Sequence, residues 1–497
     1  MSTTLTSQLA DLSTAAAAFL ERAPLGNFIA GDFTAGSETF TTIDPSTGAP
    51  IAEIATASQQ DIDAAVAAAR EAFNGPWRKL TGIKRGELIN KLADLIAENA
   101  EELAQLESID NGKPVKIAQY VDVAGSVKHL RYFAGWASKL EGRAIPVEAK
   151  DMFVYTERVP VGVCAQIVPW NFPLMMAVWK LAPALTAGCT VVLKAAEQTP
   201  LTALRLADLV KEAGFPEGVV NVVNGDGAVG AALVDHPGVD KIAFTGSTAV
   251  GREIGSKAGR ELKRVTLELG GKSPNIIFED ADLKAAIGGS FQSIYFNTGQ
   301  ACNAGSRLFV QNSLYEEVTS QLAELASNSV VGPGLTQGTT FGPVVSEQQF
   351  DRVNEYIQIG LDEGAEAIAG GVAEREDGGY FIRPTLFTGV ESDMRIAREE
   401  IFGPVLAATR FEDLEEIAAK ANDNEYGLAA GLWTRDIGRA HKFAGMLESG
   451  MVYINMWGLT DPAAPFGGVK SSGIGREHGA ENLDAYLETK TVWTSLT

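Results

Sequence analysis

From about residue 160 to residue 270, the sequence alternates short β-rich runs with amphipathic segments, the pattern of βα units around a parallel sheet. We expect a helix through 176–185, and another that begins with Thr199 as N-cap and Pro200 in its first turn and ends at Gly214. The β-rich runs are 161–168, 191–194, 219–223 and 241–244. This alternation predicts the α/β fold class.

A second alternation of strands and helices follows from residue 269 to about residue 476. Upstream, 61–73 and 85–107 are predicted to be helical, and the acidic first turn at Asp61 suits the helix dipole. Because 497 residues exceed what one hydrophobic core holds, we expect two or three domains. The β-rich runs of the second alternation include 308–310, 367–369 and 453–455.

The charge balance argues against nucleic acid as a partner. Lys and Arg number 41 and Asp and Glu number 63, a formal net charge of -22, and so acidic a surface repels a phosphate backbone. Three scattered cysteines, Cys164, Cys189 and Cys302, indicate a reducing compartment rather than a disulfide framework. The four histidines have no metal-ligand spacing, so we predict no metal site and interpret them as structural or surface residues. They are His129, His236, His441 and His478.

We expect a soluble, cytoplasmic protein without membrane association. Residues 15–20 form an apolar run without a preceding basic residue, which predicts a short helix rather than a secretory signal. No stretch approaches the roughly 20 apolar residues that span a bilayer.

Three polar motifs carry chemically useful side chains. Cys302 lies in a Gly-rich turn at 299–305, and Glu268 and Asn171 lie in the preceding motifs ELGGK and PWNFP. A thiolate attacks a carbonyl carbon, a carboxylate activates water, and an amide N–H group stabilises the alkoxide formed between these steps. The combination suits acyl transfer through a thioester, although a lone cysteine is more often a small buried hydrophobe.

A strand-to-helix turn follows the run 241–244, at Thr245, Gly246 and Ser247. Backbone N–H groups at a helix N-terminus attract anions, so this turn suits a phosphate group. It is not a Gly-x-Gly-x-x-Gly sequence, and the motif alone favours an ordinary strand-to-helix turn.

Taken in chain order, these motifs resemble the signature regions of the NAD(P)-dependent aldehyde dehydrogenase superfamily. The resemblance implies that Cys302 is the nucleophile, that Glu268 activates water, and that Asn171 binds the oxyanion together with the Cys302 backbone N–H. It also implies that Lys180 and Glu477 pass protons to Glu268 or hold it in place.

The resemblance also implies a dinucleotide site. Lys194 and Glu197 match residues that bind the adenosine ribose, Ser247 matches a pyrophosphate contact, and Glu400 and Phe402 match the pair that holds the nicotinamide. A carboxylate accepts hydrogen bonds from a ribose diol but repels a 2′-phosphate, so NAD is favoured over NADP. The other predicted cofactor contacts are Ile167, Pro169, Trp170, Phe244, Thr245, Gly246, Leu269 and Gly270.

The substrate channel is predicted to be aromatic and to lack a cation. Stretches 133–137, 170–176 and 460–468 are most similar to the phenylacetaldehyde dehydrogenase branch, which implies an aromatic or arylalkyl aldehyde. Betaine-type and aliphatic aldehydes remain open, whereas a dicarboxylic semialdehyde requires Arg or Lys in the wall. The predicted lining residues, which equally suit an ordinary core, are Phe172, Met176, Trp179, Phe296, Ala301, Asn303, Trp457 and Phe466.

The family resemblance implies a division of the chain. A Rossmann-like NAD-binding domain takes residues 1–139 and 160–269, and a second α/β catalytic domain takes residues 270–476. Segments 140–159 and 477–497 form a β flap that joins subunits into a homo-oligomer, either a tetramer or a dimer. An unpaired strand edge in such a flap requires a partner.

Two alternatives differ in chemistry. A CoA-acylating semialdehyde dehydrogenase passes the acyl group to CoA, and Glu268 argues against it because such relatives generally lack a water-activating base there. A non-catalytic structural or binding protein on this scaffold is expected to lack Cys302 or Glu268, and both are present.

Overall fold

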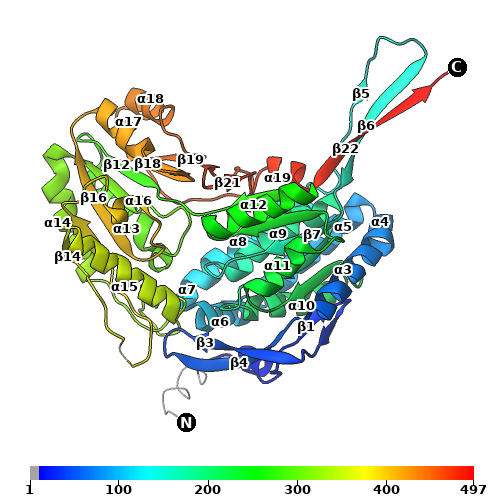
Figure 1. The fold of residues 1–497 in the computed structure, drawn as a ribbon, viewed down its shortest axis with the longest axis horizontal. Helices are drawn as coiled ribbons and strands as arrows, with labels where there is room; N and C mark the ends of the chain where they lie inside the picture. Colours follow the sequence, from blue (N-terminus) through cyan, green and yellow to red (C-terminus); the bar gives the residue numbers. More distant parts are fainter. Residues whose placement is uncertain (1–10, 376) are drawn as a thin grey trace.

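A parallel sheet forms where the alternation at 160–270 predicts it. The computed structural model describes residues 11–375 and 377–497, and its first sheet has the strand order β2-β1-β9-β8-β7-β10-β11-β21 (Figure 1). The five central strands are parallel, whereas β1, β2 and β21 add to the edges in antiparallel pairing. The strands are β1 (Asn27–Ile29), β2 (Asp32–Thr34), β7 (Val163–Ile167), β8 (Thr190–Lys194), β9 (Val220–Val223), β10 (Lys241–Thr245), β11 (Arg264–Glu268) and β21 (Gly473–Ile474).

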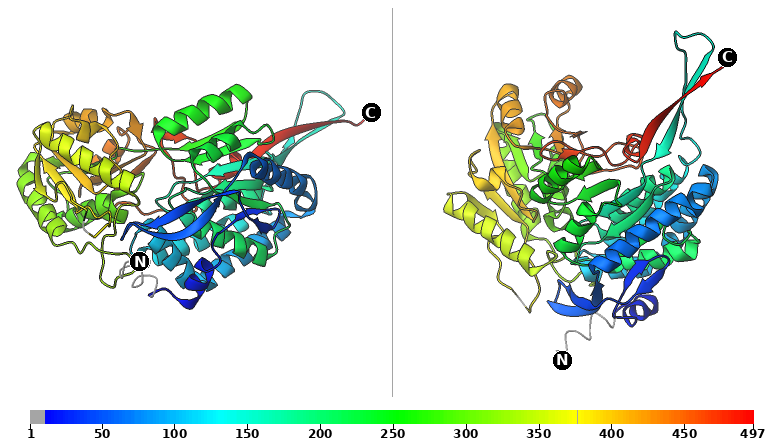
Figure 2. Two further views of the ribbon diagram at one scale, coloured as in Figure 1. Left: turned by 60° about the horizontal axis from the view of Figure 1, so that its bottom comes forward. Right: turned by 45° about the vertical axis from the view of Figure 1, so that its right-hand side comes forward.

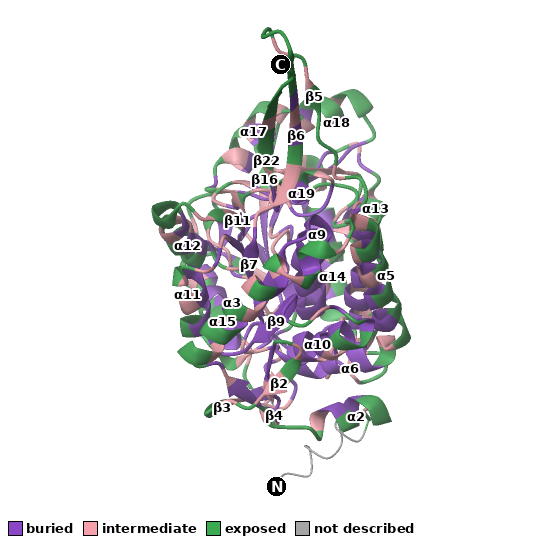
Figure 3. Ribbon diagram, turned by 90° about the vertical axis from the view of Figure 1, so that its right-hand side faces the viewer, coloured by how far each residue is buried: buried purple, intermediate pink, exposed green. Residues whose placement is uncertain are grey.

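Helices cover both faces of this sheet because its strands bury both sets of alternate side chains. The face that carries Cys164 and Val191 packs against α5 (Gly82–Glu98), α8 (Ala124–Ala134), α9 (Pro173–Ala187) and α10 (Leu201–Ala213). The face that carries Ala165 and Val192 packs against α3 (Gln59–Asn74), α11 (Gly227–Asp235) and α12 (Thr248–Glu261). Figure 3 shows these strands as a buried layer.

Two predicted helices differ from the structure at their ends. The N-cap of α10 is Pro200, not Thr199, and the amide of Leu201 donates to the distant Asp110 Oδ2 at 2.9 Å. The helix predicted at 85–107 is two helices, α5 and α6 (Ala100–Asn111). They meet at Asn99, whose Nδ2 donates to the Leu95 carbonyl at 2.8 Å and satisfies an end of α5.

A second sheet lies beside the first (Figures 1 and 2) and has the order β14-β15-β16-β13-β12-β18-β19. All its pairs are parallel except that of β14 with β15. Its strands are β12 (Pro274–Ile277), β13 (Arg307–Gln311), β14 (Glu366–Ala369), β15 (Thr385–Thr388), β16 (Val405–Phe411), β18 (Ala429–Trp433) and β19 (Met451–Ile454). One face packs on α13 (Leu283–Tyr295) and α14 (Tyr315–Ser327), the other on α15 (Glu347–Asp362), α17 (Leu414–Asn422) and α18 (Ile437–Ala444).

The predicted flap is a three-stranded antiparallel sheet that projects from the body (Figure 2). Strand β22 (Leu487–Ser495) pairs along its whole length with β6 (Met152–Pro160), and β6 pairs with β5 (Ala144–Ile145). By contrast, β21 falls inside the range predicted for the catalytic domain yet pairs with β11 in the first sheet. The chain therefore crosses back between the two sheets before it enters the flap.

The remaining elements are short or peripheral. They are α2 (Thr14–Leu20), β3 (Glu38–Asp44), β4 (Ala49–Thr56), α4 (Pro76–Lys79), α7 (Val115–Ile117), α16 (Arg395–Arg398), β17 (Tyr426–Gly427), β20 (Val469–Lys470), α19 (Glu481–Asp484), the π-helical η1 (Ala118–Val123), and the 3-10 turns η2 (Phe296–Gly299) and η3 (Asn312–Leu314). The helix predicted near the N-terminus is α2, and residues 1–10 lie outside the described residues. Among the helices of the described residues, none is both long enough and apolar enough to cross a membrane.

Candidate active site

A large cavity lies where the strand order of the first sheet reverses direction. From β7 the chain adds β8 and β9 on one side and then β10 and β11 on the other, and ligands of such sheets bind at the carboxyl ends of the strands beside this reversal. Residues that follow β7, β10 and β11 form one wall, and loops of the second sheet form the other. The cavity volume is about 1280 Å³.

Most of the predicted site residues line this cavity, including every predicted substrate residue. The lining includes Asn171, Glu268, Cys302 and Glu477; Pro169, Trp170, Thr245, Gly246, Ser247, Leu269, Gly270, Glu400 and Phe402; and Phe172, Met176, Trp179, Phe296, Ala301, Asn303, Trp457 and Phe466. The predicted residues outside the lining are Ile167, Lys180, Lys194, Glu197 and Phe244. Of these, Lys180 forms an ion pair with Glu477, which does line the cavity.

The turn before Cys302 has an unusual backbone. Asn297, Thr298 and Gly299 are consecutive left-handed residues with φ of 50°, 56° and 73°. This conformation is disfavoured for a β-branched residue such as Thr298 and persists only where the surroundings enforce it. The Thr298 hydroxyl donates to the Gly342 carbonyl at 3.1 Å, and the Val345 amide donates to Gln300 Oε1 at 3.0 Å. Cys302 therefore follows a turn that distant contacts hold in place.

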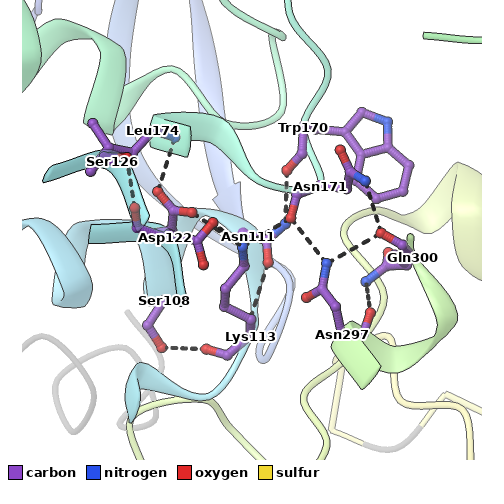
Figure 4. Close-up of polar contacts among 11 residues, drawn as sticks. Ser108, Asn111, Lys113, Asp122, Ser126, Trp170, Asn171, Leu174, Asn297 and Gln300 are labelled. Atoms are coloured by element: carbon purple, nitrogen blue, oxygen red, sulfur yellow. Dashed lines mark hydrogen bonds and ion pairs between the residues drawn. The ribbon is translucent and has the colours of Figure 1, made fainter. Parts of the chain in front are cut away.

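Asn171 is tied to the same turn (Figure 4). Its Nδ2 donates to the Gln300 carbonyl at 2.9 Å, and its own carbonyl accepts from Asn297 Nδ2 at 3.0 Å and from Lys113 Nζ at 2.9 Å. An amide nitrogen carries two hydrogens, so one stays available to an oxyanion. Asn171 is 4% exposed and lines the cavity.

A buried charge cluster behind Asn171 escaped the sequence reasoning. Lys113 Nζ lies 3.1 Å from Glu107 Oε1 and 2.9 Å from Asp122 Oδ1, and all three side chains are fully buried. Burial raises the pKa of Asp122 well above its usual range, Glu107 adds to the rise, and Lys113 opposes it. The one sign of such a cluster in the sequence is a charged residue that has apolar neighbours.

The Cys302 thiol is held in its protonated form. Burial raises its pKa to about 12, and the carboxylates of Glu268 and Glu400 add to the rise. The backbone amides of Cys302 and Asn303 oppose it. A thiol in this state requires a base or a nearby positive charge to become nucleophilic.

Glu268 faces a buried ion pair. Lys180 Nζ lies 2.6 Å from Glu477 Oε1, and all three residues are 5% exposed or less. Burial raises the pKa of Glu268 well above its usual range, and Glu477 adds to the rise, whereas Lys180 and Arg476 oppose it. A carboxylate with a raised pKa is a stronger base, as water activation requires.

The cofactor side has the groups that a dinucleotide needs. Ser247 is the N-cap of the 14-residue helix α12, and at the end of β8 Lys194 Nζ lies 3.0 Å from Glu197 Oε2. Glu400 Oε1 accepts from the Gly271 amide at 2.9 Å, and burial raises its pKa to about 7. The Phe402 ring contacts Trp170 edge-on, with centroids 5.2 Å apart. Ser247 and Glu400 therefore face each other from opposite walls of the cavity, whereas Lys194 and Glu197 lie outside its lining.

The substrate side is mostly aromatic, as predicted. The Phe172 and Phe296 rings stack with centroids 5.9 Å apart, and Trp179 meets Phe466 edge-on at 5.3 Å. The lining of the whole cavity also includes two cations, the exposed Lys128 on α8 and Arg352, whose guanidinium donates to the Glu400 carbonyl. Lys128 lies three residues after residue 125 on α8, a spacing that puts both on one face of the helix, and both line the cavity.

Two histidines also line the cavity, His129 and His478. They are 0% and 1% exposed, so the interpretation as surface residues is wrong for this pair. The other two histidines lie elsewhere, and in the described part of the chain no cluster of His, Cys, Asp or Glu is arranged to hold a metal ion.

The fold and the site together define a class of protein. A doubly wound sheet with dinucleotide-binding features faces a cysteine, a carboxylate and an amide donor across one cavity, which is the arrangement of an oxidoreductase that works through a covalent thioester. The family model for the aldehyde dehydrogenase family matches residues 33–492. The chain belongs to the aldehyde dehydrogenase family, and the predictions of family, fold class and enzyme class are confirmed.

Relatives cover nearly the whole chain. Human mitochondrial aldehyde dehydrogenase is 50% identical over 459 residues, 92% of this chain and 88% of the human protein. The solved NAD+ complex of a Bacillus cereus aldehyde dehydrogenase is 51% identical with a TM-score of 0.96, covering 98% of this chain and 99% of that one. A Staphylococcus aureus betaine aldehyde dehydrogenase in complex with NAD+ is 38% identical with a TM-score of 0.94, covering 98% and 97%.

Proposed function

We propose that this protein oxidises an aromatic or arylalkyl aldehyde, such as phenylacetaldehyde, to the carboxylic acid with NAD as electron acceptor. The observation that carries the substrate class is the stacked pair of Phe172 and Phe296, with Trp179 and Phe466 beyond it, in the wall of the cavity that contains Cys302. Offset or edge-on contacts with an aryl ring add to the burial of its surface.

The catalytic steps follow from the side chains in the cavity. Cys302 Sγ gives up its proton to solvent, attacks the aldehyde carbon and forms a thiohemiacetal, whose oxyanion accepts from Asn171 Nδ2 and from the Cys302 backbone N–H. NAD, when bound, supplies the acceptor for the hydride that leaves this carbon. Glu268 then removes a proton from water, which attacks the resulting thioester and releases the acid and the Cys302 thiol. Lys180 and Glu477 set the basicity of Glu268 through the ion pair beside it.

The residues on the cofactor side support NAD rather than NADP. Glu197 and Glu400 would accept from ribose hydroxyls, and a carboxylate at Glu197 would repel a 2′-phosphate. The relatives from Bacillus cereus and Staphylococcus aureus are described as NAD+ complexes. Ser247 and the N-terminus of α12 would hold the pyrophosphate.

A substrate screen tests the proposal. With NAD, we expect kcat/KM for aryl and arylalkyl aldehydes to exceed that for aliphatic and betaine-type aldehydes, and Phe296→Leu to reduce this difference. Phe33→Leu, which alters a half-buried phenylalanine on β2 outside the cavity lining, is the matched control. A preference for carboxylated aldehydes through Lys128, or NADH formation that depends on CoA, would contradict the proposal.

The flap supports assembly into a homo-oligomer. Phe153 and Trp493 are 47% and 61% exposed on its strands, and an apolar surface of this kind is commonly covered by a second subunit. The proposed cofactor unit consists of residues 1–139 and 160–269, and the proposed catalytic unit of residues 270–476. Residues 140–159 and 477–497 form the proposed assembly unit. Light scattering of the intact protein distinguishes a tetramer, a dimer and a monomer, and cell fractionation tests the proposed cytoplasmic location.

A further inference from the structure

The histidine pair in the cavity wall has unused hydrogen-bonding capacity. His129 lies on α8 and His478 follows Glu477, and their ring centroids are 4.9 Å apart. Within the described residues, none of their four ring nitrogens makes a well-directed hydrogen bond, although all four are buried. Weaker polar contacts link the His129 ring to the backbone of Trp179, and the His478 ring to the backbone of Asp461 and Ala464. Buried polar atoms without partners are rare in folded proteins and require an explanation.

The pair belongs to the substrate side of the cavity. The His478 ring meets Trp179 edge-on with centroids 3.9 Å apart, and the His129 ring stacks on the same indole at 6.0 Å. His478 also lies 5.9 Å from the Phe466 ring. The two imidazoles therefore place polar atoms among the aromatic rings of the substrate side.

His478 is held in this position at a conformational cost. Its backbone φ is 60°, in the left-handed region that residues other than glycine rarely adopt. Such conformations cluster at binding sites, where the surrounding structure enforces them. Here the reciprocal backbone hydrogen bonds of Glu477 with Phe466, both 2.7 Å, hold the adjacent residue.

Burial disfavours the charged form of both imidazoles. Burial lowers the pKa of His478 to about 4, against the opposing effect of Glu477, and burial followed by the neighbouring His478 lowers that of His129. A neutral imidazole offers one N–H donor and one nitrogen acceptor. The pair thus suits an uncharged group that both donates and accepts, which is a hydroxyl, better than a carboxylate or an ammonium.

We propose that His129 and His478 are specificity residues that bind a hydroxyl group carried by the aldehyde, away from its carbonyl carbon. This inference rests on the proposed function in one respect: the aldehyde that carries the hydroxyl group is an aryl aldehyde. A cavity with buried hydrogen-bonding groups discriminates against an analogue that lacks the matching group, because those groups then stay unpaired. The preferred substrate class is therefore a hydroxylated arylalkyl aldehyde.

Six aldehydes separate this inference from the proposed function. Phenylacetaldehyde and its 2-, 3- and 4-hydroxy forms are compared with hexanal and 6-hydroxyhexanal, by kcat/KM with NAD. We expect the best hydroxylated aryl aldehyde to exceed the plain one by about tenfold, which corresponds to about 1.4 kcal/mol. If aryl aldehydes are no better than alkyl ones, the proposed function fails. If the hydroxyl has no effect in either series, the inference fails.

The variants show whether the histidines cause the preference. His129→Leu and His478→Leu should reduce the ratio of kcat/KM for the hydroxylated over the plain aldehyde to about threefold or less, because each removes one donor and one acceptor. His478→Gln carries the same backbone strain as His478→Leu and should retain part of the preference. His441→Leu, on the exposed side of α18, is the control.

A purely structural histidine pair gives a different result. Loss of packing lowers kcat/KM for hydroxylated and plain aldehydes alike and leaves their ratio unchanged. The same unchanged ratio is expected if water molecules, rather than substrate, occupy the ring nitrogens. Either outcome would overturn the inference, and the single variant at position 129 provides the answer should changes at position 478 impair folding.

Discussion

Lys113→Met removes the only ammonium from the buried cluster behind Asn171. Its Nζ bonds Glu107, Asp122 and the Asn171 carbonyl at 3.1, 2.9 and 2.9 Å, and no water-exposed surface compensates for its loss. Removing one partner of a buried ion pair costs about 3–5 kcal/mol, because the remaining charge is left without compensation. We therefore expect a large loss of thermal stability, measured by scanning fluorimetry.

Arg131→Met is the matched control for stability. The Arg131–Asp94 pair has a similar separation of 2.9 Å, but its side chains are 55% and 59% exposed. Exposed pairs contribute about 0–1 kcal/mol, so the control should unfold within a few degrees of the parent protein. If Lys113→Met is as stable as Arg131→Met, the reasoning on the buried cluster is refuted.

A neutral triple variant separates stability from catalysis. Glu107→Gln, Lys113→Met and Asp122→Asn together remove all three charges at similar volume, which should recover most of the stability. The Asn171 carbonyl still lacks its ammonium donor, and a displacement of catalytic groups by about 1 Å reduces rates by about 10²-fold. We expect the triple variant to be stable and slow. Parental kcat/KM in this variant would refute a positioning role for Lys113.

Further expectations concern the reacting groups and the cofactor. Cys302→Ser should abolish NADH formation and retain NAD binding by calorimetry; more than trace turnover contradicts the nucleophile assignment. Glu268→Gln should release one NADH per site and accumulate a thioester detectable by mass spectrometry, and normal steady-state turnover contradicts its role as base. Glu477→Gln removes a charge that raises the pKa of Glu268, so the acid limb of thioester hydrolysis should move to lower pH, and an unmoved limb argues against the coupling. Glu197→Gln should raise the NADP/NAD ratio of kcat/KM by about tenfold to a hundredfold, or about 1.4–2.7 kcal/mol; an unchanged ratio shows that Glu197 does not face the ribose.

The proposed reacting groups could be selected from the sequence because acyl transfer demands particular residue types in short motifs. Cys302, Glu268 and Asn171 each lie in a local Gly-rich or aromatic motif, and the structure brings all three to one cavity. The central strands were predictable for a similar reason, since a parallel sheet buried on both faces requires continuous apolar runs such as 191–194.

Residues whose environment depends on distant contacts were not predictable in this way. Lys113 lies in the sequence Asn111-Gly112-Lys113-Pro114, which has the composition of an exposed turn, yet it is buried because the Asn171 carbonyl and two carboxylates converge on it. The N-cap of α10 was misplaced because Asp110, far away in the chain, satisfies its first amide.

The histidines show why spacing is a poor guide to a binding site. No metal-ligand spacing relates His129 to His478, so sequence reasoning assigned them no role in a site. The fold packs both against Trp179, and burial then removes water from their ring nitrogens. Hydrogen-bonding capacity without a partner is a property of the folded cavity alone. The reaction chemistry does not fix which residues form the substrate wall. The structure therefore adds most to the family motifs in that wall, because it shows which of its residues are buried.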